Sequence, residues 1–282
     1  MACSIPTDNN TTIPNWLDLP VEITANILQR LNTIDIVTSA CKVCPLWENI
    51  CKDPLMWRTI RMRYNDASPY IFNHVDLVKI CRFAVKQSCG HLEDIDIDYF
   101  CTDDLLRYIT VNAGNLRRMR LASCQGISYM GFSKAVIKLS KLEEVDISFC
   151  NLPWECLEDL GSSCPLLKSF KFELMNTLQC SNYHAFAIAE TMQGLIHLDI
   201  QGNILNNTGL LAILDACPLL ESLDIDRCFN LNLTGNLGQR CREQIKVLRL
   251  PRWFNDDQYC SDVDLDADYD DYGDVPYDYR EY

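Results

Sequence analysis

Cysteine is unusually frequent in this sequence, with 16 Cys among 282 residues. Two thiolates separated by two residues can both bind one zinc ion, and Cys41 and Cys44 have this spacing. A zinc site needs four ligands, however, and no second pair follows at the spacing of a zinc finger. We therefore interpret Cys41 and Cys44 as thiols on one face of a helix, and we expect no metal site.

The residues that most often catalyse reactions are scattered along the chain. The four histidines, His74, His91, His184 and His197, do not have the spacing of a metalloprotease helix. The chain has 11 Gly, and they form no glycine-rich loop that could hold a phosphate group. The sequence therefore predicts a non-catalytic protein without a cofactor.

The cysteines also indicate a cell compartment. They make up about 6% of the residues, below the ~8–10% that is typical of a disulfide scaffold. The first sixteen residues lack the basic segment and apolar core of a secretory signal, and every apolar run is shorter than the ~18 residues of a membrane helix. We expect free, buried thiols, no membrane contact, and a location in the nucleus and/or the cytoplasm.

Most of the net charge of −14 lies in one segment. Residues 254–282 contain eleven acidic residues and one Arg, which gives −10 and leaves −4 for the other 253 residues. We predict that residues 1–14 and this acidic tail are disordered. Its six Tyr leave two roles open, a solvating tail or a segment that docks on a basic partner. The near-neutral remainder has no basic stripe for nucleic acid.

One short pattern returns seven times: an apolar residue, with further apolar residues at +3 and +5. The gaps between successive copies are 24, 26, 25, 28, 25 and 25 residues, within the ~20–29 residues of leucine-rich repeats. The copies are LEDIDI from Leu92, LRRMRL from Leu116, LEEVDI from Leu142, LKSFKF from Leu167, LIHLDI from Leu195, LESLDI from Leu220 and IKVLRL from Ile245.

Each copy predicts a strand followed by a helix. Positions +3 and +5 point to one side of a strand and are buried, whereas +4 and +6 point to the other side. Position +8 is often Cys or Asn, small residues that can bond to the backbone where the chain leaves the strand. The fourth copy fits least well, with Phe170, Phe172 and Met175. We predict an α/β arc over residues 63–253, with about seven repeats, parallel strands on the concave side and helices on the convex side.

The period changes in residues 15–62, where three short helices are expected. Ile23, Ile27 and Leu31 follow helical spacing after Leu19-Pro20, and a second apolar face leads to Pro45 and Trp47. Such a small module cannot bury a self-sufficient core. The sequence therefore predicts that a partner covers it.

The LxxLxLxxC pattern, with helices that end in Cys, resembles plant F-box/LRR-repeat proteins, and LPVEITANILQRL and DPLMWRTI resemble the F-box itself. The resemblance implies a substrate-recognition subunit of an SCF-type ubiquitin ligase, which binds a Skp-type adaptor and through it cullin and RING subunits. A target protein held by the repeats would then be ubiquitinated and degraded by the proteasome. The adaptor contacts that the resemblance implies are Leu19, Pro20, Ile23, Ile27, Leu28, Leu31 and Trp47. Alternatively, some of these residues only hold the helices together.

The +4 residues predict where the target binds. They are charged in all seven copies and lie on the concave side, flanked by two aromatic and two charged residues. The row is Asp96, Arg120, Asp146, Lys171, Asp199, Asp224 and Arg249, and the flanking residues are Asp98, Tyr99, Phe149 and Arg227. An ordinary solvated surface is the alternative reading.

Two other functions remain open at this stage. The arc can be an interaction scaffold without a link to ubiquitin, which failure to bind a Skp-type adaptor would favour. It can also be a co-receptor for a small molecule, as the plant hormone-sensing F-box proteins are. Seven repeats, however, predict an open surface instead of a closed pocket.

Overall fold

The computed structural model describes residues 18–63, 73–174 and 181–251. The segments 1–14 and 254–282, for which we predict disorder, lie outside the described residues, and so does Met175. The helices are α1 (Val21–Leu28), α2 (Thr33–Thr38), α3 (Pro45–Cys51), α4 (His74–Gln87), α5 (Asp103–Asn112), α6 (Tyr129–Val136), α7 (Glu155–Ser163), α8 (Tyr183–Thr191), α9 (Asn207–Ala216) and α10 (Asn236–Gln244), with the 3-10 helices η2 (Ala40–Lys42) and η3 (Pro54–Trp57). The strands are β1 (Thr59–Met62), β2 (Asp94–Asp98), β3 (Arg118–Ala122), β4 (Glu144–Ser148), β5 (Ser169–Glu173), β6 (His197–Asp199), β7 (Ser222–Asp224) and β8 (Val247–Arg249).

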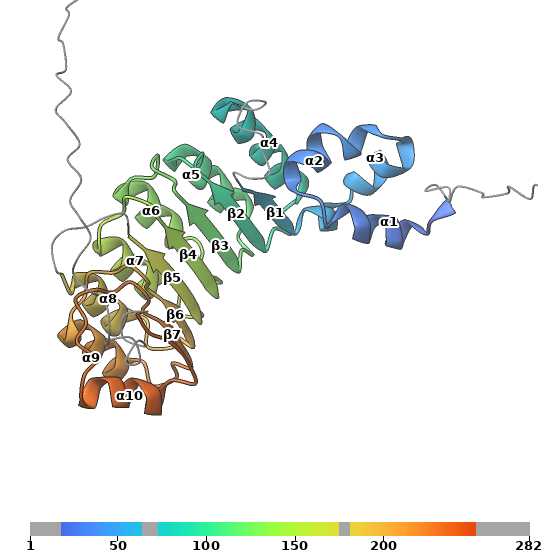
Figure 1. Ribbon diagram of the computed structural model, residues 1–282. Coiled ribbons are helices and arrows are strands. Elements are labelled where there is room, and N and C mark those ends of the chain that lie inside the picture. The colour runs from blue at the N-terminus through green and yellow to red at the C-terminus, as the bar shows by residue number, and fades with distance from the viewer. Residues whose placement is uncertain (1–17, 64–72, 175–180, 252–282) are drawn as a thin grey trace, which may run out of the picture.

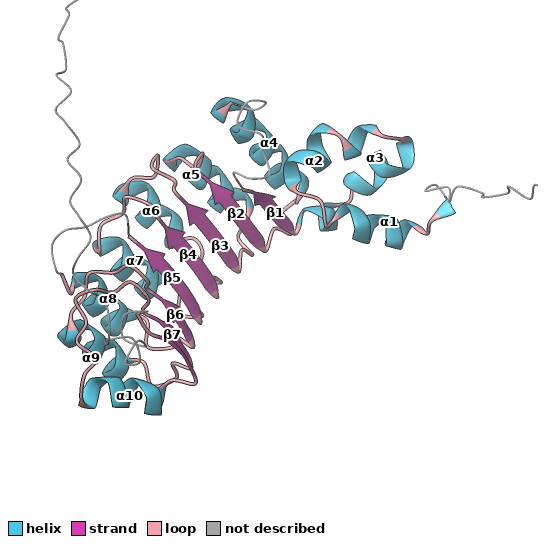
Figure 2. Ribbon diagram, in the orientation of Figure 1, coloured by secondary structure: helices cyan, strands magenta, loops and turns pink. Residues whose placement is uncertain are grey.

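The eight strands form one parallel sheet in the order of the sequence, from β1 to β8. Helices α4 to α10 follow the outer side of the curved sheet, and the strands line its inner side (Figures 1 and 2). The predicted α/β arc is therefore confirmed. Within the described residues, none of the helices has the length and apolar content that a bilayer crossing requires.

The sheet begins one strand earlier than the repeat pattern predicts. Strand β1 pairs with β2 in the register of Ile60 with Ile95, although its sequence belongs to the segment that we assigned to the N-terminal module. Trp57 takes the place of the repeated leucine, with Ile60 at +3 and Met62 at +5, and all three side chains are buried. The sheet therefore has one strand more than the seven repeats that the sequence predicts, and Trp57 anchors this additional first strand.

Strand β1 is also the point where the sheet meets the helical module. The backbone N–H of Arg61 donates to Thr33 Oγ1 of α2 at 2.9 Å. Thr33 is buried, so its hydroxyl satisfies a strand donor at an edge that would otherwise remain open. The module therefore caps the first strand of the array.

The cysteines and Asn203 at position +8 bond to the backbone, as the sequence predicts, and the bond joins neighbouring repeats. Each donates to the carbonyl oxygen of the +5 residue in the preceding repeat: Cys124 to Ile97 (3.7 Å), Cys150 to Leu121 (3.4 Å), Asn203 to Phe172 (3.0 Å) and Cys228 to Ile200 (3.2 Å). At the ends of the helices, Cys164 donates to Leu139 and Cys217 to Met192. Burial raises the pKa of the Cys228 thiol to about 12, so it remains a protonated donor.

This arrangement predicts that Asn203 can be exchanged for Cys but not for Ala. Asn203→Ala leaves the Phe172 carbonyl without its donor in a buried place, and we expect the free energy of unfolding to fall by about 1–3 kcal/mol. Asn203→Cys restores the donor that other repeats use and should cost clearly less. Chemical denaturation measures both values, and equal losses would contradict this role for the side chain.

Candidate functional site

The helical module has a small core that Trp57 completes. The Trp57 side chain is buried, and its Nε1 donates to the Cys51 carbonyl at 2.8 Å. Leu28, Ile34 and Ile50 are buried as well. Asn32 Oδ1 accepts from the N–H of Asp35 at the start of α2, and Pro45 occupies the first turn of α3. These signals divide the module into short helices that expose much of their surface.

The predicted adaptor contacts do not all share one surface. Ile23 and Pro20 are exposed, Leu19 and Ile27 are partly buried, and Trp47 packs partly against the core. Leu28 is fully buried, so its assignment as an adaptor contact is corrected: it holds α1 on the module. An apolar stripe in a sequence does not distinguish the side that packs inward from the side that is left outside.

The structure places three apolar residues of this module differently from what the sequence indicated. Leu31 lines a hollow between the module and the sheet, together with Arg30 and Asn32. Val21 and Leu55 are about half exposed, and neither was among the predicted contacts. Val21 opens α1 directly after Pro20, so a search for exposed apolar residues in the first helical turn would have found it.

The predicted row of +4 residues lies side by side across the sheet, as the strand register requires. Asp96 is opposite Arg120, Arg120 opposite Asp146, and Asp146 opposite Lys171. The row continues through Asp199 and Asp224 to Arg249. The structure therefore places all seven residues in one line along the concave face.

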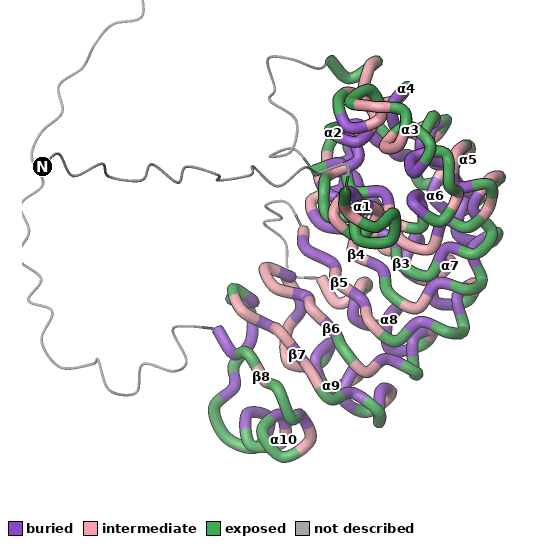
Figure 3. The backbone as a smooth tube through the Cα atoms, turned by 90° about the vertical axis from the view of Figure 1, so that its right-hand side faces the viewer, coloured by how far each residue is buried: buried purple, intermediate pink, exposed green. Residues whose placement is uncertain are grey.

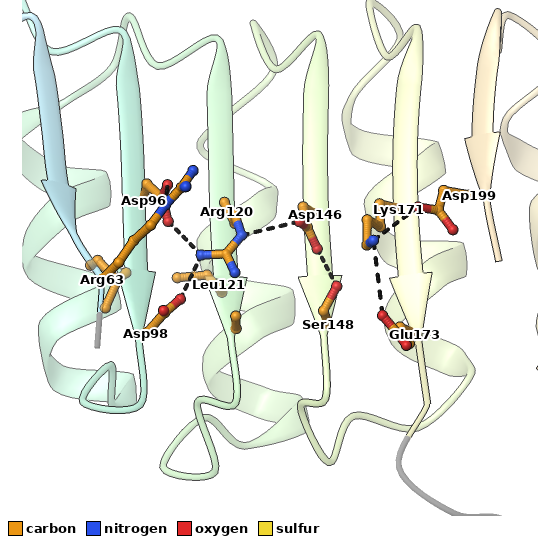
Figure 4. Close-up of polar contacts among 12 residues, drawn as sticks. Arg63, Asp96, Asp98, Arg120, Leu121, Asp146, Ser148, Lys171, Glu173 and Asp199 are labelled. Carbon is orange, nitrogen blue, oxygen red and sulfur yellow. Dashed lines mark hydrogen bonds and ion pairs between the residues drawn. The ribbon is translucent and has the colours of Figure 1, made fainter. Parts of the chain in front are cut away.

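These charges are paired with one another within the chain (Figure 4). Arg120 reaches Asp96 at 2.6 Å, Asp98 at 2.5 Å and Asp146 at 3.2 Å. Arg63 also contacts Asp96, at 2.5 Å, so this buried carboxylate lies between two guanidinium groups. The sequence predicted that these charged side chains face a partner protein. In the structure they form ion pairs with one another.

The second half of the face repeats this arrangement with other residues. Lys171 contacts Asp199 at 2.9 Å and Glu173 at 3.9 Å. Glu173 is buried and also pairs with Arg227, and Arg249 contacts Asp224 at 3.1 Å. Sequence reasoning missed Glu173, although it occupies the same +6 position as Asp98.

Burial and ion pairing shift the pKa values of two residues in this network, Asp146 and Arg120. Burial raises the pKa of the Asp146 carboxyl, against the lowering effect of Ser148 and Arg120. For Arg120, burial lowers the pKa of the guanidinium, but hydrogen bonds from it to Asp96 and Asp98 raise the pKa above its ordinary value. Arg120 therefore stays charged and is the central cation of the network.

The flanking residues Tyr99, Phe149 and Arg227 follow their strands at position +7. Their φ angles are 70°, 57° and 59°, in the left-handed region that side chains other than Gly rarely adopt. The N–H of Tyr99 donates to Ala122, and that of Phe149 donates to Glu173 in the next repeat. At Tyr99 and Phe149 this turn therefore carries the backbone pairing past the strand end, whereas the N–H of Arg227 donates to Asp226 Oδ1.

In the described ranges, no group of three or more His, Cys, Asp or Glu side chains is placed to hold a metal ion. The acidic side chains of the concave face are paired with Arg and Lys instead.

Removal of Arg120 should destabilise the fold more than removal of Arg118. Arg120→Gln leaves Asp98 and Asp146 without their common cation, and we expect a loss of about 2–3 kcal/mol in the free energy of unfolding. In Arg118→Gln, Asp94 keeps Arg61, so the loss should stay below about 1 kcal/mol. Chemical denaturation tests this order, and the gap should narrow as the pH falls towards ~4, where carboxylates become protonated.

The N-terminal module and the whole chain are similar to known proteins. The F-box-like family model matches residues 16–63. The F-box protein SKIP19 of Arabidopsis thaliana is 44% identical over 268 residues, which cover 95% of this chain and 84% of that protein. Putative F-box/LRR-repeat protein 22 of the same plant is 42% identical, with 86% of this chain and 79% of the relative covered.

A longer protein of the same plant is also similar in sequence to this chain. Putative F-box/LRR-repeat protein 23 of Arabidopsis thaliana is 45% identical over 84% of this chain, which spans 53% of that relative. Together with the module of short helices and the parallel repeat sheet, these matches cover both parts of the structure in the same order. The chain therefore belongs to the F-box/LRR-repeat proteins.

Proposed function

We propose that the chain is the substrate-recognition subunit of an SCF-type ubiquitin ligase. The F-box-like module binds a Skp-type adaptor, which connects the chain to cullin and RING subunits. The repeat arc binds a target protein, which is then ubiquitinated and directed to the proteasome. The chain itself is a non-catalytic adaptor that brings target and ligase together.

The observation that carries this proposal is the apolar surface left on α1. Val21 and Ile23 are about half exposed, next to Pro20 at the start of the helix, although the core of the module is small. Exposed apolar side chains on so small a module indicate a partner surface. The family match over residues 16–63 supports a Skp-type adaptor as that partner.

The concave face supports target binding by a protein segment over a small molecule. A hollow with a volume of about 730 Å³ runs along strands β1 to β5. Its lining is dominated by charged residues, among them Arg61, Asp94, Arg118 and Asp146. A site for a small molecule is more often apolar with a few polar groups. An open, charged trough fits a polar protein surface better than it fits a hormone-like ligand.

Removal of the exposed apolar side chains of α1 should weaken adaptor binding. For Val21→Ala combined with Ile23→Ala, we expect a loss of about tenfold or more, because central contacts of an interface typically contribute ~2 kcal/mol or more. Calorimetry with a purified plant Skp-type adaptor measures the dissociation constant. Val111→Ala is the matched control, since Val111 is an exposed apolar residue on α5 of the arc. Unchanged affinity in the double variant would refute the assignment, and no binding by the wild-type chain would favour a scaffold without a link to ubiquitin.

Exposed cations of the concave face should determine which proteins the chain captures. In Arg118→Ala combined with Arg249→Ala, we expect the captured target to fall by about tenfold, because two donors at separate points of the face are lost. Quantitative mass spectrometry of co-purified plant proteins provides the readout. The control is Arg107→Ala with Arg240→Ala, which removes two paired cations from the convex helices. An unchanged set of captured proteins in the concave variant would show that the target binds elsewhere.

A further inference from the structure

The ion pairs of the concave face are layered. In every pair, the carboxylate lies close to the sheet and the cation lies outside it. The cationic side chains are 31–71% exposed, and the carboxylate side chains are 6–26% exposed. The cations are Arg61, Arg63, Arg118, Arg120, Lys171, Arg227 and Arg249, and the carboxylates are Asp94, Asp96, Asp98, Asp146, Glu173, Asp199 and Asp224.

This layering does not arise only because Arg and Lys are longer than Asp and Glu. On the convex helices, Arg82 is 35% exposed and its partner Asp104 is 63% exposed. Arg240 and Asp215 show the same order, with 37% and 65%. The carboxylate is the outer group in both of these pairs, whereas in Arg107–Asp104 and Lys79–Asp76 the cation is the more exposed group. The convex helices therefore show both orders, and the pairs of the concave face show only one.

The layering gives the concave face a preference for anions, although its charges are balanced in number. A guanidinium group has five N–H donors, and the side chains of Arg118 and Arg249, which are 45% and 71% exposed, are each paired with one carboxylate of the sheet. A group that approaches these pairs from solvent meets the donors before it meets the paired carboxylates, although Glu144 and Asp35 are exposed carboxylates in the same hollow. An acidic segment is thus attracted, whereas a basic segment is repelled by the outer layer.

We propose that the concave face binds the acidic tail of the chain itself, residues 254–282. This inference rests on the proposed function, because it takes the concave face to be the target surface, and it makes the tail a competitor of the target. The tail has eleven acidic residues against one Arg, which complements the outer layer of cations. The same preference implies that the target offers an acidic segment to this face.

The tail is long enough to reach every strand. The described chain ends at Pro251, two residues after β8. Strands are ~4.8 Å apart, so the path from β8 to β1 is on the order of 34 Å. The 29 residues of the tail span up to ~95 Å when extended.

A convex groove between α5 and α6 is a less suitable place for the tail. Lys134, Lys138 and Ile137 line it, and together they would suit a segment rich in Asp and Tyr. Asp103 and Asp104 line the same groove, however, and Asp104 is largely exposed. Asp103 accepts hydrogen bonds from Ser128, and Asp104 is paired with Arg82 and Arg107. The groove thus offers three cations, Arg107, Lys134 and Lys138, against seven in the layer of the concave face.

A labelled peptide of residues 256–282 tests the proposal on the full-length chain. The receptor is a variant in which the ten Asp of the tail become Asn and Glu281 becomes Gln, so that the chain keeps its length and loses the competing charge. Fluorescence anisotropy should show binding to this variant and about tenfold or more weaker binding to the wild-type chain, whose own tail occupies the face. Raising the salt from about 0.05 M to about 0.5 M should weaken the binding. No binding to the variant, or equal binding to both chains, would overturn the proposal.

Paired substitutions in the same variant locate the site. Arg118→Gln with Arg249→Gln should lower the affinity for the peptide by about tenfold or more, whereas Arg107→Gln with Arg240→Gln should leave it unchanged. An equal loss in both variants would place the peptide elsewhere. Light scattering of the wild-type chain should show a monomer, since a dimer that dissociates when the tail is neutralised would make a second copy the occupant.

Adaptor binding by the same preparations separates this proposal from the proposed function. If the peptide experiment fails while the Skp-type adaptor still binds, only the role of the tail is overturned. If the adaptor does not bind to the wild-type chain, the proposed function fails, whatever the peptide does. Circular dichroism of each variant confirms that the sheet and helices are retained.

Discussion

A single repeat of this chain cannot fold alone, because one strand and one helix cover their apolar sides only with the next strand and helix. The bonds from Cys or Asn at position +8 show how closely this dependence is built in, since each satisfies a carbonyl of the repeat before it. Figure 3 shows the result, with buried stretches along both the strands and the helices, where the two layers cover each other. The curvature of the face, the position of its charges and its open shape all depend on this repeated pairing.

The pairing also explains why the concave face is rich in charge and yet stable. Parallel strands in register bring equivalent positions of successive repeats next to one another, so like charges at +4 would repel. Asp96, Arg120 and Asp146 alternate in sign, and so do Lys171 and Asp199. Asp199 and Asp224 are neighbours of the same sign, and there Lys171 and Arg249 supply cations from either side.

Much of the fold could be predicted from the sequence, because burial at +3 and +5 requires apolar residues in every repeat. Strand β1 was not predicted, because its residues lie in the segment 15–62 that we assigned to the helical module, and because its anchor is Trp57 where the repeats have Leu or Ile. The repeat pattern predicted that the +4 residues form one line, but it did not predict how far each charged side chain is exposed. Whether Asp96 is covered by Arg63 and Arg120 depends on side-chain conformations, which spacing does not determine. Leu28 was misplaced because the side of α1 that faces the core is set by its neighbours.

The hydrogen bond from Arg61 N–H to Thr33 Oγ1 joins the sheet directly to the helical module. Because β1 belongs both to the F-box-like match and to the sheet, the two functional surfaces are joined without a linker. In the proposed ligase, the arc would then act as a rigid arm with a fixed angle to the adaptor. In that proposed role, a target lysine would receive ubiquitin only if this arm places it within reach of the other ligase subunits. Inserting one repeat would move a target bound at the far end by ~4.8 Å, so the number of repeats would help to determine which lysine is modified.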